Sequence, residues 1–400
     1  MGAESFGQTL RRLRLRAGMS IRDLARLASC GKSYISDLEH GRGTPSLAVA
    51  TALDRALGAG GELVALVPSV PMWRAPMGTL DGQFTADDEE RLVLAARRPS
   101  RLDLVAVAHL RHQVHQLDDR YVSEPSTALL ADAGQYLAQV RFLSTHAPSG
   151  RVRRELSAVE AEAATLMSQL VWDASQRRDH ATAHLYLDQA LRAARQCCDP
   201  VAEGLALLRK TIVVLYGEQN PRTALTLAQQ TAETTTHASE VLRALALLHM
   251  AEAHAMLGAQ AACEAALAEA ETCFGRVDST DAAIDLFSFS QFGRMAGSCY
   301  LFLQDHRRAQ SLLEDTARAL DDQSKAQAIV LGNLALTAIR QGNLGDAAAR
   351  LHQAIDVIEV NWGGGGLNIV FGASRELRSW PAVPVVQDVQ DRLLSLMTMR

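Results

Sequence analysis

The stretch MSIRDLARLASCGKSYISDLEHG, residues 19–41, decides how the first part of the chain folds. Ser20 stands three residues before Asp23, which is a variant of the capping box that opens a helix. Apolar residues follow at helical spacing until a short break at residues 29–31. A further helix is expected over residues 32–40, and Gly41 ends it. Two short helices joined by a tight turn predict a helix-turn-helix.

More helices are expected on both sides of this pair. Before it, an apolar stripe at helical spacing predicts one helix: Phe6, Leu10 and Leu13. After it, Ser46 caps a fourth helix, and residues 62–66 form a short fifth one. Residues 1–66 are therefore expected to form a small five-helix domain.

Charge is distributed unevenly along the chain. Residues 1–45 contain eight Lys or Arg and four Asp or Glu, which gives a net charge of +4. The whole chain carries −5, so the remaining residues carry −9. A basic N-terminal end on an acidic body indicates that this end contacts a polyanion.

Three stretches of the N-terminal region have a familiar order and spacing. Residues 19–25, residues 32–41 and the pair Pro45-Ser46 closely resemble the DNA-binding domain of phage-repressor-like (XRE-family) regulators. The resemblance extends over about residues 5–66, roughly a sixth of the chain. It implies that the helix beginning at Lys32 lies in the major groove of double-stranded DNA.

The resemblance also implies roles for single residues. Lys32, Ser33 and Asp37 take the positions that read base edges, where Lys32 donates to guanine and Asp37 accepts from cytosine. Ser36 shares this outward face, and phosphate contacts are implied for three arginines: Arg14, Arg16 and Arg42. Ile21 stands where the family usually has Gln, a departure that affects a phosphate contact and not the fold.

Residues 67–100 are expected to form a linker. Prolines and glycines interrupt regular structure in its first half: Pro68, Pro71, Pro76, Gly78 and Gly82. The acidic residues 87–90 start a short helix, which Pro99 stops. The helical body is expected to begin at Arg101 and to include residues 101–400.

A loose repeat recurs along this body. In each unit the second of two helices carries small, large and small residues at i, i+4 and i+7, so that paired helices approach closely and the large residue fills the next groove. The copies are Ala183/Leu187/Ala190, Cys263/Leu267/Ala270, Ala309/Leu313/Thr316, Ala347/Leu351/Ala354 and a weaker Ala224/Ala228/Thr231. Over about residues 155–360 the pattern resembles tetratricopeptide (TPR) repeats in longer units.

The predicted fold class is all-α, a helix-turn-helix domain followed by a TPR-like α-solenoid. Residues 101–145 are expected to form a degenerate or capping unit. Gly363–Gly366 is expected to be a flexible loop that ends the array, and residues 385–399 are expected to form a terminal capping helix.

Stacked helical pairs leave a concave face that the first helix of each pair lines. Gln, Asn and Arg side chains on such a face suit an extended peptide backbone or an acidic ligand. The predicted groove residues are Gln169, Trp172, Arg209, Tyr216, Glu252, Gln291, Arg294 and Asn333.

No pattern in the sequence indicates catalysis, a cofactor or a metal. HExxH, GxxxxGK[ST] and GxGxxG do not occur, and His180 and His184 lack a third ligand at motif spacing. The six cysteines form no CxxC pair, which is typical of thiols in a reducing cytoplasm. The uncharged run Val360–Ser374 is too short for a membrane helix, and no signal sequence is recognisable at the N-terminus.

The sequence therefore predicts a cytoplasmic transcriptional regulator without enzymatic activity. A single recognition helix reads few base pairs, so a homodimer spanning half-sites about 34 Å apart is expected. Binding of a peptide, a small molecule or a protein partner by the body would then change the distance between the two DNA-binding domains.

This layout resembles peptide-sensing regulators with TPR bodies and bacterial, especially actinobacterial, regulators. Arg supplies 37 of the 40 basic residues, which fits a GC-rich bacterial genome. The alternative is a TPR-like interaction scaffold whose helix-turn-helix docks a protein partner. The salt dependence of binding separates the two, since phosphate contacts weaken steeply with salt.

Overall fold

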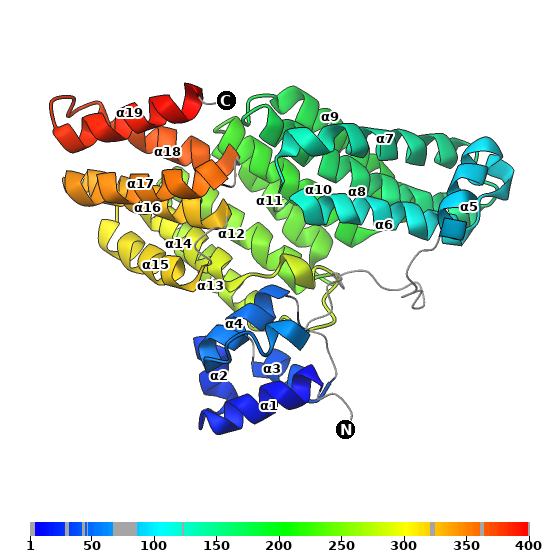
Figure 1. The fold of residues 1–400 in the computed structure, drawn as a ribbon, viewed down its shortest axis with the longest axis horizontal. Coiled ribbons are helices and arrows are strands. Elements are labelled where there is room, and N and C mark those ends of the chain that lie inside the picture. The colour runs from blue at the N-terminus through cyan, green and yellow to red at the C-terminus, as the bar shows by residue number, and fades with distance from the viewer. Residues whose placement is uncertain are drawn as a thin grey trace.

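The computed structural model describes residues 5–28, 32–41, 45, 47–66, 86–121, 124–320, 325–360 and 364–398. Within these ranges the chain is helical and contains no strand, which confirms the predicted all-α class (Figure 1). A small N-terminal domain precedes a large body of paired helices. The N-terminal domain consists of α1 (Phe6–Arg16), α2 (Ile21–Leu27), α3 (Lys32–Glu39), α4 (Leu47–Leu57) and the 3-10 helix η1 (Val64–Leu66).

Capping residues set the helix starts in the N-terminal domain. Ser20 and Asp23 form the predicted capping box at the start of α2, and Ser5 with Gln8 forms another before α1. Gly18 and Gly41 end α1 and α3 at positive φ, a conformation that glycine adopts without strain. The helices enclose a core of fully buried side chains, among them Leu10, Leu24, Ile35, Leu38, Leu53 and Leu63.

The body begins earlier than the sequence predicted. Helix α5 (Ala86–Arg97) lies within the expected linker, and its residues Leu92 and Ala95 are buried in one core with α6 (Leu104–Tyr121) and α7 (Ser126–Thr145). The short 3-10 helix η2 (Pro99–Arg101) joins α5 to α6. The part of the predicted linker before residue 86 lies outside the described residues. The linker prediction missed the packing of α5, because one apolar face of three turns is a weak signal.

The remaining helices of the body alternate as the repeat predicted. The first helices of successive pairs are α8 (Gly150–Ala174), α10 (Pro200–Ile212), α12 (Glu240–Met256), α14 (Phe289–Phe302) and α16 (Lys325–Arg340). A π-helical turn, η3 (Val213–Gly217), extends α10, and a 3-10 turn, η4 (Ile284–Leu286), precedes α14. The second helices are α9 (His180–Cys197), α11 (Pro221–Thr235), α13 (Gln260–Phe274), α15 (His306–Ala319) and α17 (Leu344–Val360).

The small-large-small triplets occupy the buried faces of these second helices. Every triplet residue is buried, including the polar Thr231 and Thr316. A side chain at Gly297 of α14 would place its Cβ 2.6 Å from the Cγ of Leu313, so glycine is required there for α14 and α15 to approach. Close packing of paired helices therefore explains the repeat in the sequence.

Side-chain caps start four of the second helices. The side chains of Asp179, Asn220, Asp305 and Asn343 each accept a hydrogen bond from the backbone N–H three residues later. The residue before the cap has positive φ in three of these turns: Gln219, Gln304 and Gly342. These caps thus fix where four of the five second helices begin.

The C-terminal end of the body contradicts one prediction. Gly363–Gly366 was expected to be a loop, but helix α18 (Gly364–Leu377) begins within it. A Cβ at Gly366 would lie 2.7 Å from the Cβ of Ala328, so the glycines let α18 start in close contact with α16. Helix α19 (Pro384–Thr398) is the predicted terminal helix and buries Val386, Val389, Leu393 and Leu396.

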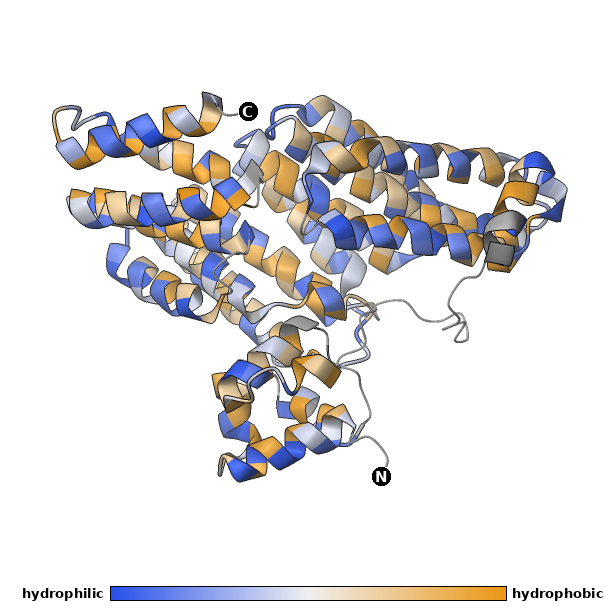
Figure 2. Cartoon of the chain, in the orientation of Figure 1, coloured by the Kyte–Doolittle hydropathy of each residue, from blue (hydrophilic) through white to orange (hydrophobic). Residues whose placement is uncertain are grey.

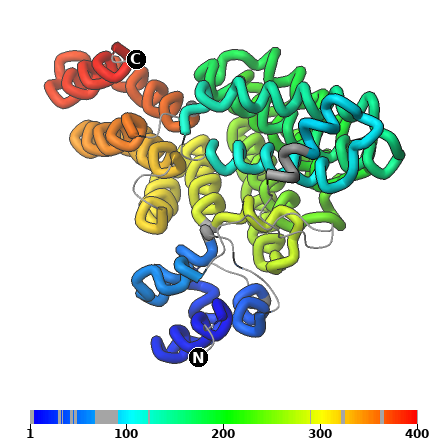
Figure 3. Tube along the Cα trace, turned by 45° about the vertical axis from the view of Figure 1, so that its right-hand side comes forward, coloured from blue at the N-terminus to red at the C-terminus, as the bar shows by residue number. Residues whose placement is uncertain are grey.

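The row of helices curves until its two ends approach each other. Helix α18 packs against α8, and Nζ of Lys325 on α16 donates a 2.8 Å hydrogen bond to the carbonyl oxygen of Tyr121 on α6. Figures 1 and 3 agree that the N-terminal domain lies beside α12–α15 and away from α5–α7. The apolar core of the N-terminal domain is continuous with that of α12–α14. Figure 2 shows apolar and polar residues alternating around most helices, as expected for helices with one buried face.

Candidate DNA interface

Helix α3 turns one face to the core and the other away from it. Tyr34, Ile35 and Leu38 are buried, whereas Lys32 is exposed and Ser36 and Asp37 are half-buried. The structure thus brings three of the predicted DNA-contacting residues to one outward face. The side chain of Ser33 and the whole of Arg42 lie outside the described residues, so their predicted roles stay predictions.

Arg14 does not lie where a phosphate contact requires it. Its side chain is buried and forms two hydrogen bonds to the carboxylate of Glu39 on α3, from Nε at 2.5 Å and from Nη2 at 2.8 Å. Nη1 donates to the carbonyl oxygen of Met19 at 2.9 Å. The hydrogen bond to Glu39 raises the pKa of Arg14 despite partial burial. The geometry therefore corrects the prediction for Arg14, which holds the helices together. Arg16 is exposed, so its predicted phosphate contact stays a prediction.

Helix α2 carries two exposed basic residues. Arg22 and Arg26 are exposed, and Arg26 lies 3.6 Å from the carboxylate of Asp23. The sequence analysis did not select them, although the first helix of a helix-turn-helix crosses the DNA backbone. Ile21, at the departure from the family pattern, is half-buried and packs against the core. It therefore offers no polar group to a phosphate.

Comparison with known proteins agrees with this geometry. Residues 5–67 match the family model described as a helix-turn-helix domain. The chain carries a helix-turn-helix domain. This match supports a DNA-binding regulator, because base-reading helices of this kind are held by such domains.

Comparisons over the whole chain are less specific. No curated protein matches the chain by sequence. Among solved structures, BtubC (BKLC) from P. vanneervenii is 16% identical, with a TM-score of 0.42, over 58% of this chain and 91% of that chain.

In the helical body, the eight predicted groove residues all lie on the first helices of the repeat units or on η3. Trp172, Glu252 and Asn333 are buried, and the other five are half-buried. The structure joins Tyr216 directly to Glu252 through a hydrogen bond. Among the described residues, no side-chain hydrogen bond joins Gln291 or Asn333 to the other groove residues.

One polar network connects η3, α12 and α14. The Tyr216 hydroxyl donates to Oε2 of Glu252, and the Ser298 hydroxyl donates to Oε1 of Glu252 at 2.6 Å. Nδ1 of His249 lies 3.2 Å from the Tyr216 hydroxyl oxygen. Burial raises the pKa of Glu252 and lowers the pKa of His249 to about 3, so His249 is neutral. The sequence analysis missed His249 and Ser298, which no motif marks.

A second polar network connects α6, α8 and α16. The Tyr121 hydroxyl donates to Oδ2 of Asp173, and Nε of Arg177 donates to Oδ1 of Asp173 at 3.2 Å. Lys325 lies over the Tyr121 ring at 4.3 Å, and its burial lowers its pKa. The Trp172 indole N–H donates to Nδ1 of His180 at 3.1 Å. This hydrogen bond occupies one ring nitrogen of His180, which the sequence analysis considered with His184 as a possible metal ligand.

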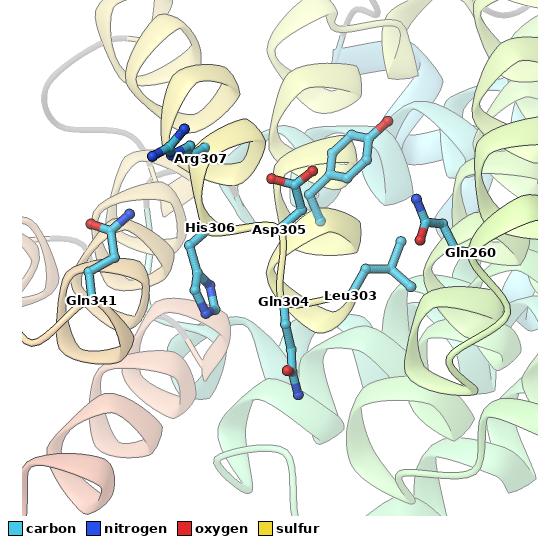
Figure 4. Close-up of a pocket in the computed structure, with 8 residues that line it drawn as sticks. Gln260, Leu303, Gln304, Asp305, His306, Arg307 and Gln341 are labelled. Carbon is cyan, nitrogen blue, oxygen red and sulfur yellow. The ribbon is translucent and has the colours of Figure 1, made fainter.

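An open cavity of about 530 Å³ lies elsewhere, at the turn between α14 and α15. Figure 4 shows Gln260 and Gln341 on opposite sides of this turn, which carries Gln304 and Asp305. None of the eight predicted groove residues lines this cavity. In the described ranges, no cluster of His, Cys, Asp and Glu could hold a metal ion, and no helix has the length and apolar character needed to cross a membrane.

Proposed function

We propose that the protein is a sequence-specific DNA-binding transcriptional regulator that acts as a homodimer in the cytoplasm of a bacterium. The observation that carries the proposal is the helix-turn-helix match over residues 5–67 together with the outward polar face of α3. The net charge of +4 on residues 1–45, against −5 for the whole chain, gives this end the electrostatic preference for a polyanion.

Within this proposal, α3 lies in the major groove. Lys32 donates to guanine O6 and N7, Asp37 accepts from cytosine N4, and Ser33 bonds either kind of base edge. Ser36, Arg16 and Arg42 contact the sugar-phosphate backbone, and the exposed Arg22 and Arg26 of α2 add to this set. These contacts place the helix but do not by themselves choose the sequence.

The body is proposed to be a TPR-like sensor and dimerisation unit. Five second helices with buried triplets and inner first helices with polar side chains support a repeat of this kind. A dimer supplies the second recognition helix that useful affinity needs. A ligand that binds the body in one shape only shifts the population of shapes and hence the spacing of the DNA-binding domains.

The test is DNA capture with the purified full-length chain from a random duplex library, followed by salt titration of the selected duplex. We expect affinity to fall linearly with salt on logarithmic axes, by about 0.9 per phosphate contact. Lys32→Ala should relax sequence preference, while Arg16→Ala should weaken binding to all sequences and reduce the slope by about 1. Arg192→Ala is the matched control, since Arg192 is exposed on α9. Absence of binding to every duplex at low salt would overturn the proposal, and salt-independent capture of a protein would favour the scaffold alternative.

A further inference from the structure

We propose that Arg209 on α10 and Arg294 on α14 form the binding site for a small oxyanion, a molecule that carries carboxylate or phosphate groups. The inference assigns a ligand class to the sensor body and rests on the proposed function only for its regulatory consequence. The two arginines differ from all comparable residues in the body.

The difference lies in their ion pairs. Seven arginines in the described part of the body are half-buried: Arg111, Arg177, Arg209, Arg243, Arg294, Arg350 and Arg392. Five of these contact a carboxylate within 4.0 Å, from Glu162, Asp173, Glu269, Asp346 and Asp356 respectively. Arg209 and Arg294 have no ion pair and no side-chain hydrogen bond with any described residue. Guanidinium groups withdrawn from water are normally paired, because an unpaired buried charge is costly.

One nitrogen atom of the half-buried Arg209 is shielded from solvent as well as unpaired. Its Nε is shielded from solvent and has no hydrogen-bond partner. Buried donors of this kind are rare in folded proteins and require an explanation. A bound anion supplies the missing acceptor.

The two arginines act on one common neighbour, His249. Both lower the pKa of His249, beyond the effect of its burial, so both positive charges lie close to this one imidazole ring. Arg294 also acts on Tyr216 and Glu252, and Arg209 acts on Tyr121. Helices α10 and α14 each pack against α12, which carries His249 between them.

The acids nearby are already engaged. Both carboxylate oxygens of Glu252 accept hydrogen bonds, from Tyr216 and Ser298. Both oxygens of Asp173 accept bonds from Tyr121 and Arg177. Lys325 adds a third cation, which donates to the Tyr121 carbonyl oxygen and lies over the Tyr121 ring. The two polar networks, which Arg209 links through its action on Tyr121 and His249, together hold two acids, Asp173 and Glu252, and four cations: Arg177, Arg209, Arg294 and Lys325. They carry an excess of two positive charges.

These features select the chemistry of the ligand. A guanidinium group binds carboxylate or phosphate through two parallel N–H···O bonds, a geometry that lysine cannot offer. Gln291 lies one turn before Arg294 on the same face of α14 and adds an amide donor for a second oxygen. A molecule with about two negative charges would balance the excess. The neutral His249 neither repels such a ligand nor neutralises it.

The test is calorimetric titration of the purified full-length chain with citrate, succinate and inorganic phosphate at constant chloride. The first two probes report a carboxylate ligand, and the third reports a phosphate ligand. We expect saturable binding of at least one probe. The Kd should rise about tenfold or more in Arg209→Lys and in Arg294→Lys, because lysine keeps the charge but cannot form the two parallel N–H···O bonds of a guanidinium group. Arg209→Met and Arg294→Met should abolish it. Without anion, the Met variants should unfold at the parent temperature or above, because they remove half-buried cations that have no ion pair with a described residue.

Arg192→Lys is the matched control and should leave anion binding unchanged. Lys32→Ala, in the proposed DNA-contacting helix, should also leave it unchanged, so a failure of the DNA proposal does not affect this measurement. The inference is overturned if no probe binds saturably, or if either arginine can be changed to Lys and to Met without raising the Kd.

Discussion

The guanidinium group of Arg14 on α1 forms two hydrogen bonds, at 2.5 and 2.8 Å, to the carboxylate of Glu39 in the last turn of α3. Its third contact is the Met19 carbonyl oxygen, in the turn that leads into α2. One side chain thus connects α1, α3 and the turn before α2. Both members of the pair are only 8% exposed, so water screens the interaction weakly. The orientation of the proposed DNA-reading helix therefore depends on a buried ion pair with α1.

Replacing Arg14 with Ala should lower the free energy of unfolding of the helix-turn-helix domain by about 3 kcal/mol, since the Glu39 carboxylate would be left buried and unpaired. Duplex binding should fall for every sequence. Thermal unfolding followed by circular dichroism, together with a duplex-binding assay, checks this. Arg16→Ala is the control, because Arg16 is exposed and its loss should weaken binding without changing stability. Equal stability of the Arg14 and Arg16 variants would contradict the role given to the pair.

Gly7→Ala should destabilise the same domain by about 1–3 kcal/mol through overpacking. A Cβ at residue 7 would lie 2.2 Å from the carbonyl oxygen of Leu38, and a backbone atom cannot turn aside as a side chain can. Helices α1 and α3 would have to separate. Chemical denaturation measures the effect.

Gly134→Ala is the matched control for this substitution. Gly134 lies in the middle of α7, and a Cβ there meets only the Met167 Cε at 4.0 Å. Alanine should stabilise α7 by about 0.5–1 kcal/mol, because it has the higher helix propensity. If both variants shift stability in the same direction, the close approach at Gly7 is not the cause.

The neutral state of His249 predicts a dependence of stability on pH. Its pKa is lowered from 6.5 to about 3, first by burial and then by the charges of Arg294 and Arg209. The unfolded chain binds a proton at this residue below about pH 6.5, and the folded chain does not until about pH 3. The contribution of His249 is therefore fully present above pH 6.5. It is lost as the pH falls towards 3, at up to about 1.4 kcal/mol per pH unit.

His249→Gln should flatten the fall in stability between pH 6.5 and pH 4, as measured by denaturant titration at each pH. Glu252 has the opposite sign: its pKa is raised by burial, so its contribution decreases as the pH rises above its ordinary value. Glu252→Gln should therefore steepen the net loss on acidification. Parallel pH profiles for the parent protein and His249→Gln would show that His249 does not carry this dependence.

Local signals in the sequence predicted much of the fold. The capping box of Ser20 and Asp23 predicted the start of α2. The triplets predicted the buried faces of those helices, since small and large residues at helical spacing have few other uses. Such features depend on neighbours within a turn or two, which a sequence displays directly.

Features that depend on distant partners were not predicted. In the sequence, Arg14 cannot be distinguished from a surface arginine. In the structure it pairs with Glu39, which lies 25 residues away on another helix. The sequence of residues 364–366 is typical of a flexible loop. The need for glycine becomes clear only in the structure, where α18 lies against Ala328 of α16. His249 and Ser298 gain their roles only because the repeat brings α12 and α14 together. The missing information is tertiary packing.

A hydrogen bond between α4 and α15 connects the helix-turn-helix domain to the body. Arg55 of α4 donates from Nη1 to the carbonyl oxygen of Ala319 at the C-terminal end of α15. A cation is favourable there because the last carbonyl groups of a helix lack partners and carry partial negative charge. Helix α15 pairs with α14, which carries Arg294, so this contact lies between the proposed oxyanion site and the helix-turn-helix domain. Arg55→Ala should therefore loosen the domain from the body and weaken any effect of bound anion on DNA affinity, while leaving each site able to bind.

Small-angle scattering should show a larger radius of gyration for Arg55→Ala than for the parent protein, because a domain that moves relative to the body samples more extended arrangements. Arg318→Ala is the matched control: its side chain pairs with Asp315, and the carbonyl oxygens that Arg55 contacts belong to the backbone. That control should scatter as the parent does. An unchanged radius of gyration for Arg55→Ala would mean that the shared apolar core of α12–α14 holds the domain without the arginine.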